Sequence, residues 1–208
     1  MIIEEIKFEL DLDAAYGVEL SAPGPRTPGL HASDLYNGLA KKLDPKRFQG
    51  SDGPNKTIMA IGLAWEQWLE RTLIGMGEVV TRPPEQCVLL GATPCYYSPD
   101  LFVVNGHPRI GEMKTTSKSS RYGIEGEKSD IYHAQTMLYC YWEGLEDARF
   151  YVLNLKGDYK SKKKGAPKGL DDFPEFHVYN VHYSGQELRD NHETHYQFGL
   201  RAGLVQAA

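Results

Sequence analysis

The chain has 208 residues, of which 41% are hydrophobic and 25% are charged, and its formal net charge is −5. These values are typical of an ordinary globular protein with one domain and a substantial core, and they exclude a disordered or fibrous chain. The negative charge argues only mildly against a nucleic-acid partner, because the distribution of charge matters more than its total.

Cysteine content and apolar runs bear on the cellular compartment. No apolar run approaches the ~20 residues needed to cross a bilayer, and the first residues lack the basic and apolar regions of a secretory signal. The three cysteines, Cys87, Cys95 and Cys140, show no CxxC spacing, and an odd number favours buried thiols in a reducing compartment. We therefore expect a cytoplasmic protein with no membrane partner.

The first part of the chain is expected to form a strand, a loop and a short helix. Apolar residues alternate over residues 2–12, which predicts a half-buried strand, and the proline- and glycine-rich residues 21–29 predict a loop. Ser33 then has the place of an N-cap before a helix over residues 34–43. Because a helix N-terminus also suits a phosphate, Ser33 is either a cap or a phosphate contact.

A longer helix is predicted from Thr57 to about Ile74, because apolar residues repeat there at helical spacing. Trp65 and Trp68 lie on this apolar stripe and are expected in the core. Glu66 lies at the edge of the stripe. From spacing alone it is interpreted first as an exposed helical glutamate.

One or two short strands over residues 79–90 are expected to precede a β-hairpin over residues 98–114. Two apolar runs flank an Asn-Gly pair in this hairpin, a pattern typical of tight turns between strands. If the loop contains three residues, Asp100 on the first strand faces Glu112 on the second. A two-residue loop would shift the register by one and separate the two acids.

The hairpin carries the residue types of a metal-dependent hydrolase. Glu112 and Lys114 are two residues apart on a strand and therefore share one face. Carboxylates that face one another among apolar residues are costly without a cation, and a hard divalent ion takes oxygen ligands of this kind. A neighbouring lysine can orient a water or offset charge on a phosphate. The alternative is an exposed aspartate beside a Glu-Lys pair at the surface.

A polar run and another helix follow the hairpin. The hydroxyls and positive charges of residues 115–121 either contact backbone phosphates or form a plain solvated loop. Asp130 is expected to cap a helix over residues 131–143, on which Gln135 and Tyr139 share one face. His133 falls off that face and is interpreted as a surface or structural histidine.

The rest of the sequence predicts two strands, a basic loop and a final helix. Strands are expected over residues 149–155 and 175–183. Residues 156–170 between them are rich in lysine, glycine and proline, which indicates either a solvated loop or a clamp on a DNA backbone. The final helix, over residues 186–202, could cover the sheet or form a subunit contact.

Four of these features occur in a defined order: a helical glutamate, an aspartate on one strand, a Glu-x-Lys motif on the next, and a helical Gln-x-x-x-Tyr motif. The residues are Glu66, Asp100, Glu112 with Lys114, and Gln135 with Tyr139. With this order and spacing, residues 33–155 resemble the PD-(D/E)xK nuclease superfamily, and specifically its RecB-like and phage lambda exonuclease-like branch.

The resemblance implies an α/β fold, a single domain with a mixed central β-sheet flanked by helices, known as the restriction-endonuclease-like core. One nuclease domain would span residues 1–208. Its core would cover about 31–155, followed by the basic loop at about 156–170 and a C-terminal strand and helix at about 175–202.

The implied activity is a metal-dependent DNA exonuclease that hydrolyses phosphodiester bonds in DNA end processing, recombination or phage replication, in a bacterial or phage-infected host cell. The metal would be Mg²⁺ or Mn²⁺, bound by the carboxylates, and the other motif residues would complete the catalytic set. That set is Glu66, Asp100, Glu112, Lys114, Gln135 and Tyr139, of which Glu66, Asp100 and Glu112 would bind the metal. Three cysteines are too few for the iron–sulfur cluster that some RecB-like nucleases hold on four, so no such cluster is expected.

The implied partner is DNA, in particular linear ends, and a homo-oligomer or a recombination partner protein stays open. The candidate DNA contacts are Ser33, Ser117, Lys118, Arg121, Lys162, Lys163 and Lys164. Three alternatives stay open as well: a DNA endonuclease of the same fold, a catalytically inactive nucleic-acid-binding protein, and an enzyme on another phosphodiester such as RNA.

Overall fold

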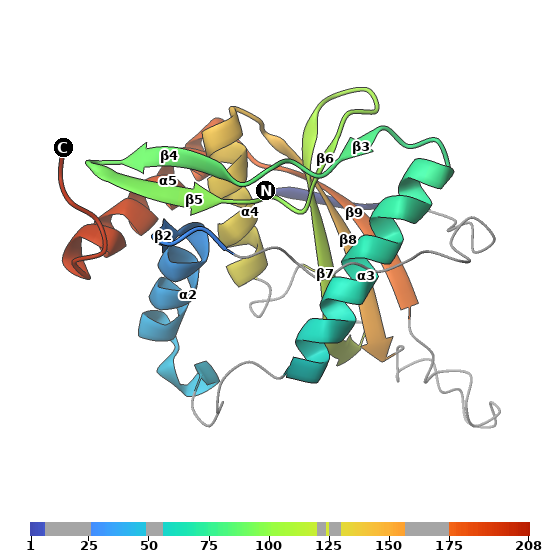
Figure 1. Cartoon of the computed structure of the whole chain (residues 1–208), viewed down its shortest axis with the longest axis horizontal. Coiled ribbons are helices and arrows are strands. Elements are labelled where there is room, and N and C mark those ends of the chain that lie inside the picture. The colour runs from blue at the N-terminus through green and yellow to red at the C-terminus, as the bar shows by residue number, and fades with distance from the viewer. Residues whose placement is uncertain (7–25, 49–55, 120–123, 125–129, 157–174) are drawn as a thin grey trace.

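The structure, a computed structural model, describes residues 1–6, 26–48, 56–119, 124, 130–156 and 175–208 (Figure 1). Its strands are β1 (Ile2–Ile6), β2 (Leu30–His31), β3 (Val80–Thr81), β4 (Gln86–Leu90), β5 (Thr93–Tyr97), β6 (Leu101–Val103), β7 (Arg109–Ser119), β8 (Asp147–Lys156) and β9 (Glu175–His182). Its helices are α2 (Ala32–Leu43), the 3₁₀ helix η1 (Pro45–Phe48), α3 (Lys56–Gly75), α4 (Asp130–Glu143) and α5 (Gly185–Arg201).

The central sheet has six strands in the order β1-β9-β8-β7-β6-β3. Strands β7 and β8 are parallel, and the other neighbouring pairs are antiparallel. A parallel pair needs a crossover connection, and α4 lies in the chain between these two strands. A smaller sheet has the order β2-β5-β4. The architecture confirms the predicted α/β fold with a mixed sheet flanked by helices.

Strand β8 separates two hydrophobic clusters because alternate side chains of a strand point to opposite faces. Phe150 and Val152 pack in a cluster that includes Leu138 of α4. Tyr151, between them, packs in the cluster that includes Trp65 and Leu69 of α3. In Figure 1, α3 accordingly lies on one side of the sheet, and α2, α4 and α5 lie together on the other.

The predicted core tryptophans and the short strands before the hairpin are confirmed. Trp65 is buried, and Trp68 is partly buried against the same cluster. Strands β3 and β4 occupy the region predicted for one or two short strands. The sequence did not predict β5, which contains Pro94 and pairs with β4 across a turn where Gly91 has a φ of +62°.

Two predictions from the sequence are wrong. Ser33 does not cap α2: the N-cap is His31, whose backbone N–H donates to Oδ2 of Asp34 at 2.9 Å. The carboxylate of Asp34, at the third helical position, thereby stabilises the first turn of α2, which begins two residues before the predicted helix. The thiol of Cys87 is exposed rather than buried, because it lies on an outward-facing position of β4, whereas Cys95 and Cys140 are buried.

Among the described residues, no helix combines the length and the apolar composition needed to cross a membrane.

Candidate active site

The β6–β7 hairpin has the register that the three-residue loop predicted. Phe102 pairs with Ile110, and Gly106 in the loop has a φ of +78°, which favours glycine. Asp100 lies just before β6, and its Oδ2 accepts a hydrogen bond from the backbone N–H of Met113 at 2.7 Å. The carboxylate of Asp100 is therefore held at the level of the residues on either side of Met113.

Lys114 lies between the two carboxylates of the hairpin. Its Nζ is 2.6 Å from Oε2 of Glu112 and 3.8 Å from Oδ2 of Asp100. The side chain of Glu112 is fully buried, while those of Lys114 and Asp100 are 14% and 17% exposed. The three groups thus form one compact cluster that is largely shielded from solvent.

Burial and charge determine which groups of this cluster hold protons. Burial raises the pKa of Glu112 well above its usual range, and the charge of Lys114 opposes that shift. Burial alone would lower the pKa of Lys114, but the charges of Glu112 and Asp100 raise it well above its usual value. Lys114 is therefore an ammonium group at neutral pH, which makes it a hydrogen-bond donor rather than a base.

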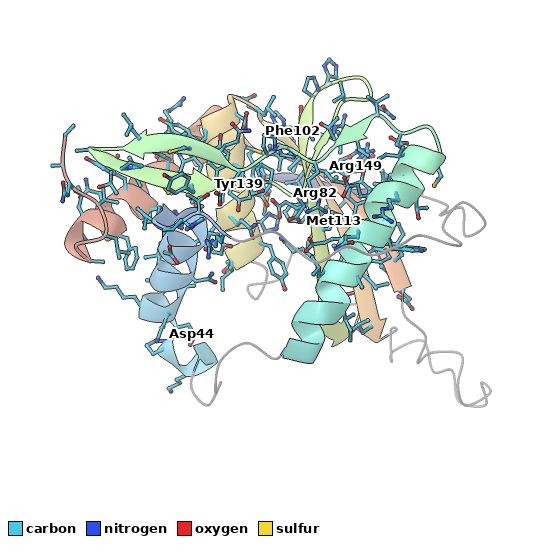
Figure 2. All side chains as sticks on the ribbon, in the orientation of Figure 1. Asp44, Arg82, Phe102, Met113, Tyr139 and Arg149 are labelled. Carbon is cyan, nitrogen blue, oxygen red and sulfur yellow. The ribbon has the colours of Figure 1, made fainter. Side chains whose placement is uncertain are left out.

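Two residues of α4 extend the cluster. Lys114 Nζ donates to Oε1 of Gln135 at 3.4 Å, and Nε2 of Gln135 donates to the hydroxyl of Tyr139 at 3.2 Å. Tyr139 is buried, and its ring lies 5.6 Å from that of Tyr97. Figure 2 labels Tyr139 at α4 and Met113 in the middle of the view, closer to α3. The glutamine amide is thus oriented by a tyrosine whose own position is fixed by packing.

Glu66, on α3, lies near the same cluster. Burial and the charge of Asp100 raise the pKa of Glu66 to about 7, although Lys114 and Arg82 oppose the shift. Arg82 Nη1 lies 3.8 Å from Oε2 of Glu66, and its Nε lies 2.9 Å from Oε2 of Glu70. Glu66 is partly buried rather than an exposed helical glutamate.

Sequence reasoning missed two residues near the cluster, Arg82 and Tyr36. Tyr36 lies on α2, and burial raises its pKa to about 12; the charge of Lys114 opposes this shift, whereas that of Glu112 adds to it. Its hydroxyl is therefore protonated and available as a donor. No spacing in the sequence indicates either residue, because α2 and β3 reach the hairpin only through tertiary packing.

The predicted DNA contacts are only partly within the described residues. Ser33 is in the first turn of α2, and its Oγ accepts from Nη2 of Arg26 at 2.6 Å. Both line a cavity of about 530 Å³ that Tyr36 and Tyr139 also line. Ser117 and Lys118 belong to β7, but their side chains lie outside the described residues, and so do Arg121, Lys162, Lys163 and Lys164.

The carboxylates of Glu112 and Asp100 are the candidate ligands for a divalent metal ion. Within the described part of the chain, no three histidine, cysteine, aspartate or glutamate side chains converge into a preformed metal cage. Oε1 of Glu112 is nevertheless buried without a hydrogen-bond partner among the described residues, and Asp100 offers a second carboxylate nearby. Mg²⁺ needs only one or two carboxylates and keeps several waters, so this donor set fits such an ion.

His133 was expected from the sequence to be a surface or a structural histidine. The buried His133 is structural: its Nε2 donates to the carbonyl of Ile124 at 2.8 Å, and its Nδ1 bonds the hydroxyl of Tyr183 at 2.7 Å. Because a carbonyl oxygen only accepts, Nε2 carries the proton, and Tyr183 donates to Nδ1 of the neutral ring. This histidine takes no part in the cluster.

Comparison with known proteins shows similarity at the level of the fold. No family model matches the chain, and no curated protein matches its sequence. Among solved structures, SSO0001 aligns with 85% of this chain and 79% of its own at 12% identity, with a TM-score of 0.50. LHK-Exo in complex with dAMP aligns at 16% identity with a TM-score of 0.46. The alkaline exonuclease LHK-Exo from Laribacter hongkongensis aligns at 17% with a TM-score of 0.45, and both LHK-Exo structures cover 85% of this chain and 89% of theirs.

Proposed function

We propose that this protein is a Mg²⁺- or Mn²⁺-dependent deoxyribonuclease of the PD-(D/E)xK type that acts as an exonuclease on linear DNA. One observation carries the proposal: the carboxylates of Asp100 and Glu112 lie on either side of the Lys114 ammonium, with one buried carboxylate oxygen unpartnered among the described residues. An aspartate and a Glu-x-Lys pair in this arrangement is the motif on which the resemblance to these nucleases depends.

The side chains have distinct roles in the proposed reaction. When bound by Asp100 and Glu112, with Glu66 in support, a divalent ion supplies the positive charge that polarises the scissile phosphodiester. Lys114 holds its proton at Nζ and donates hydrogen bonds toward the phosphate oxygens, where negative charge grows as the nucleophilic water attacks. Gln135, held by the hydroxyl of Tyr139, orients Lys114.

DNA contacts are proposed around this cluster. Ser33 and Arg26 line the cavity beside Tyr139, and a hydroxyl and a guanidinium are groups that bind phosphate. The further proposed contacts are Ser117, Lys118, Arg121, Lys162, Lys163 and Lys164. Contacts to the DNA backbone through these cations would be independent of sequence and sensitive to salt.

A DNA-digestion experiment tests the proposal. End-labelled linear duplex and single-stranded DNA are incubated with the protein in Mg²⁺, in Mn²⁺ and in EDTA. Release of labelled mononucleotides with either ion, and none with EDTA, is the expected result. Absence of hydrolysis with both ions on both substrates would contradict a nuclease.

A second substrate separates the exonuclease from an endonuclease. Closed-circular DNA has no ends, so the proposed exonuclease leaves it intact under conditions that digest the linear form. Conversion of the circle to nicked or linear DNA would replace the exonuclease with an endonuclease. A bacterial or phage-infected cytoplasm, and a role in end processing or recombination, are the context that this proposal implies.

A further inference from the structure

A groove lies between α2, α4 and α5, and the proposed chemistry does not use it. Its main cavity has a volume of about 850 Å³. A second cavity of about 430 Å³ shares Leu39, Leu43 and Thr194 with the first. The two cavities are therefore neighbours, and together they are here named the α2–α5 groove, on the side of the sheet where Figure 1 shows these three helices together.

Several apolar side chains line the groove. Leu39 and Met137 line the main cavity from α2 and α4 and are partly buried. Leu43, which lines both cavities, is 76% exposed, the largest exposed fraction among the large apolar residues described. An apolar hollow rimmed by polar residues is typical of a surface that binds a partner.

Charge is distributed unevenly along the groove. The main cavity is lined by the carboxylates of Asp44, Asp130 and Asp190, and by Glu187, which is paired with the amino group of Met1. The second cavity is lined instead by Lys42 and Arg201 together with Glu193. A ligand that fills the main cavity therefore meets an acidic rim and is complementary if it carries cations there.

A buried hydrogen-bond acceptor also lies at the main cavity. His195 lines this cavity and is only 2% exposed. Its Nδ1 bonds the carbonyl oxygen of Asn191 at 2.7 Å, so Nδ1 is the donor and Nε2 the acceptor. Nε2 has no hydrogen-bond partner among the described residues. A buried acceptor without a hydrogen-bond donor is unfavourable.

We propose that the α2–α5 groove binds an amphipathic helix of a partner protein, with an apolar stripe on its buried face and lysine or arginine beside the part of that stripe that fills the main cavity. The groove follows α5, whose 17 residues correspond to about 25 Å at 1.5 Å per residue, which matches a partner helix of several turns. Helix-in-groove recognition uses apolar anchors at i, i+3, i+4 and i+7, and the acidic rim selects basic flanks.

Two synthetic peptides of 18 residues test the proposal against the full chain. Both carry leucine at positions i, i+3, i+4 and i+7, so that the leucines form one stripe along the helix. At the positions beside this stripe, one peptide has lysine and the other has glutamate. Fluorescence anisotropy should show saturable micromolar binding of the lysine peptide and at least tenfold weaker binding of the glutamate peptide. Equal affinity of the two peptides, or no binding of the lysine peptide, would overturn the proposal.

Variants locate the binding and supply a control. Leu43→Asp should weaken the lysine peptide at least tenfold, whereas Leu89→Asp, at an apolar residue 74% exposed on β4, should not change its affinity. Both sites are exposed, so circular dichroism should show an unchanged fold. Asp190→Lys should weaken the lysine peptide and strengthen the glutamate peptide. Equal effects at Leu43 and Leu89 would assign the binding to nonspecific apolar contact.

A second copy of this chain is the competing occupant of the groove. Sedimentation of the wild type and of Leu43→Asp, without peptide, tests it. A monomer in both cases is expected, whereas a wild-type dimer that Leu43→Asp dissociates would replace the partner helix with a second copy. A long-range ¹H–¹⁵N spectrum should also show the ring resonances of His195, which lines the main cavity, shift on peptide addition, and unchanged resonances under saturating peptide would contradict binding in this cavity.

Discussion

Nζ of Lys114 lies 2.6 Å from Oε2 of Glu112, although a charged pair in a buried strand position costs desolvation. The strand places both residues on one face, and Asp100 joins them from the neighbouring strand through its hydrogen bond to Met113. The hairpin thus concentrates one cation and two carboxylates where the surrounding residues are apolar. Such an arrangement is expected where charge serves chemistry rather than stability.

Neutralising either member of this pair should abolish activity while the fold survives. We expect Glu112→Gln and Lys114→Ala each to lower kcat for linear DNA by a factor of about 10²–10³ or more, the effect of removing one electrostatic stabiliser. Initial rates of nucleotide release measure this, and circular dichroism checks the fold. Lys41→Ala, at an exposed lysine of α2, is the matched control. Full cleavage by either site variant would refute the assignment.

Arg82 should set the pH at which Glu66 loses its proton. Burial and Asp100 raise the pKa of Glu66 to about 7, and Arg82 lowers it, so Arg82→Gln should raise it further. A higher pKa leaves more Glu66 protonated at neutral pH, so the acid limb of the kcat/KM–pH profile should move to higher pH. Arg82→Lys should retain part of the wild-type profile. An unshifted acid limb in Arg82→Gln would show that Glu66 does not titrate in the reaction.

His133 should make folding stability depend on pH. Burial lowers its pKa in the folded protein, so below the unfolded value of about 6.5 the unfolded chain binds the proton more tightly. Stability from this residue is therefore present above pH 6.5 and is lost as pH falls, by up to about 1.4 kcal/mol per pH unit.

The comparison that isolates this effect is between His133→Gln and wild type, by urea unfolding at pH 7.5 and pH 5.5. Subtracting the pH dependence of one protein from that of the other removes the contribution of the buried carboxylates. That contribution has the opposite sign, because burial raises their pKa values. The free energy of unfolding should fall less with acid in His133→Gln than in wild type. His107→Gln, at an exposed histidine, should retain the wild-type difference. Parallel pH dependence in all three proteins would contradict the prediction.

Thiol labelling should distinguish Cys87 from the other two cysteines. Cys87 is exposed, whereas burial raises the pKa of Cys95 to about 12 and raises the pKa of Cys140 as well. Because the thiolate is the reactive form, a disulfide reagent should label one thiol per native chain and three after unfolding. The variant Cys87→Ser should show no rapid labelling in the native state. Two or three rapid equivalents in native wild type would be the contrary outcome.

The short-range features of the chain were determined by the sequence alone. Strand alternation places Glu112 and Lys114 on one face. The Asn-Gly turn predicts a hairpin, but the loop length decides whether Asp100 faces Glu112, and the observed register is the one that a three-residue loop gives. Helical spacing likewise placed Gln135 and Tyr139 on one face of α4. These relationships need no knowledge of distant contacts.

Tertiary structure alone decided which distant side chains meet that hairpin. Tyr36 comes from α2, and Arg82 follows β3 and pairs with Glu66 of α3; their approach to the carboxylates follows from how these elements pack together. The Glu112 oxygen that has no partner among the described residues, and the α2–α5 groove, likewise depend on packing. Burial is a property of the assembled layers, so the sequence could name the charged residues but could not say which would be desolvated.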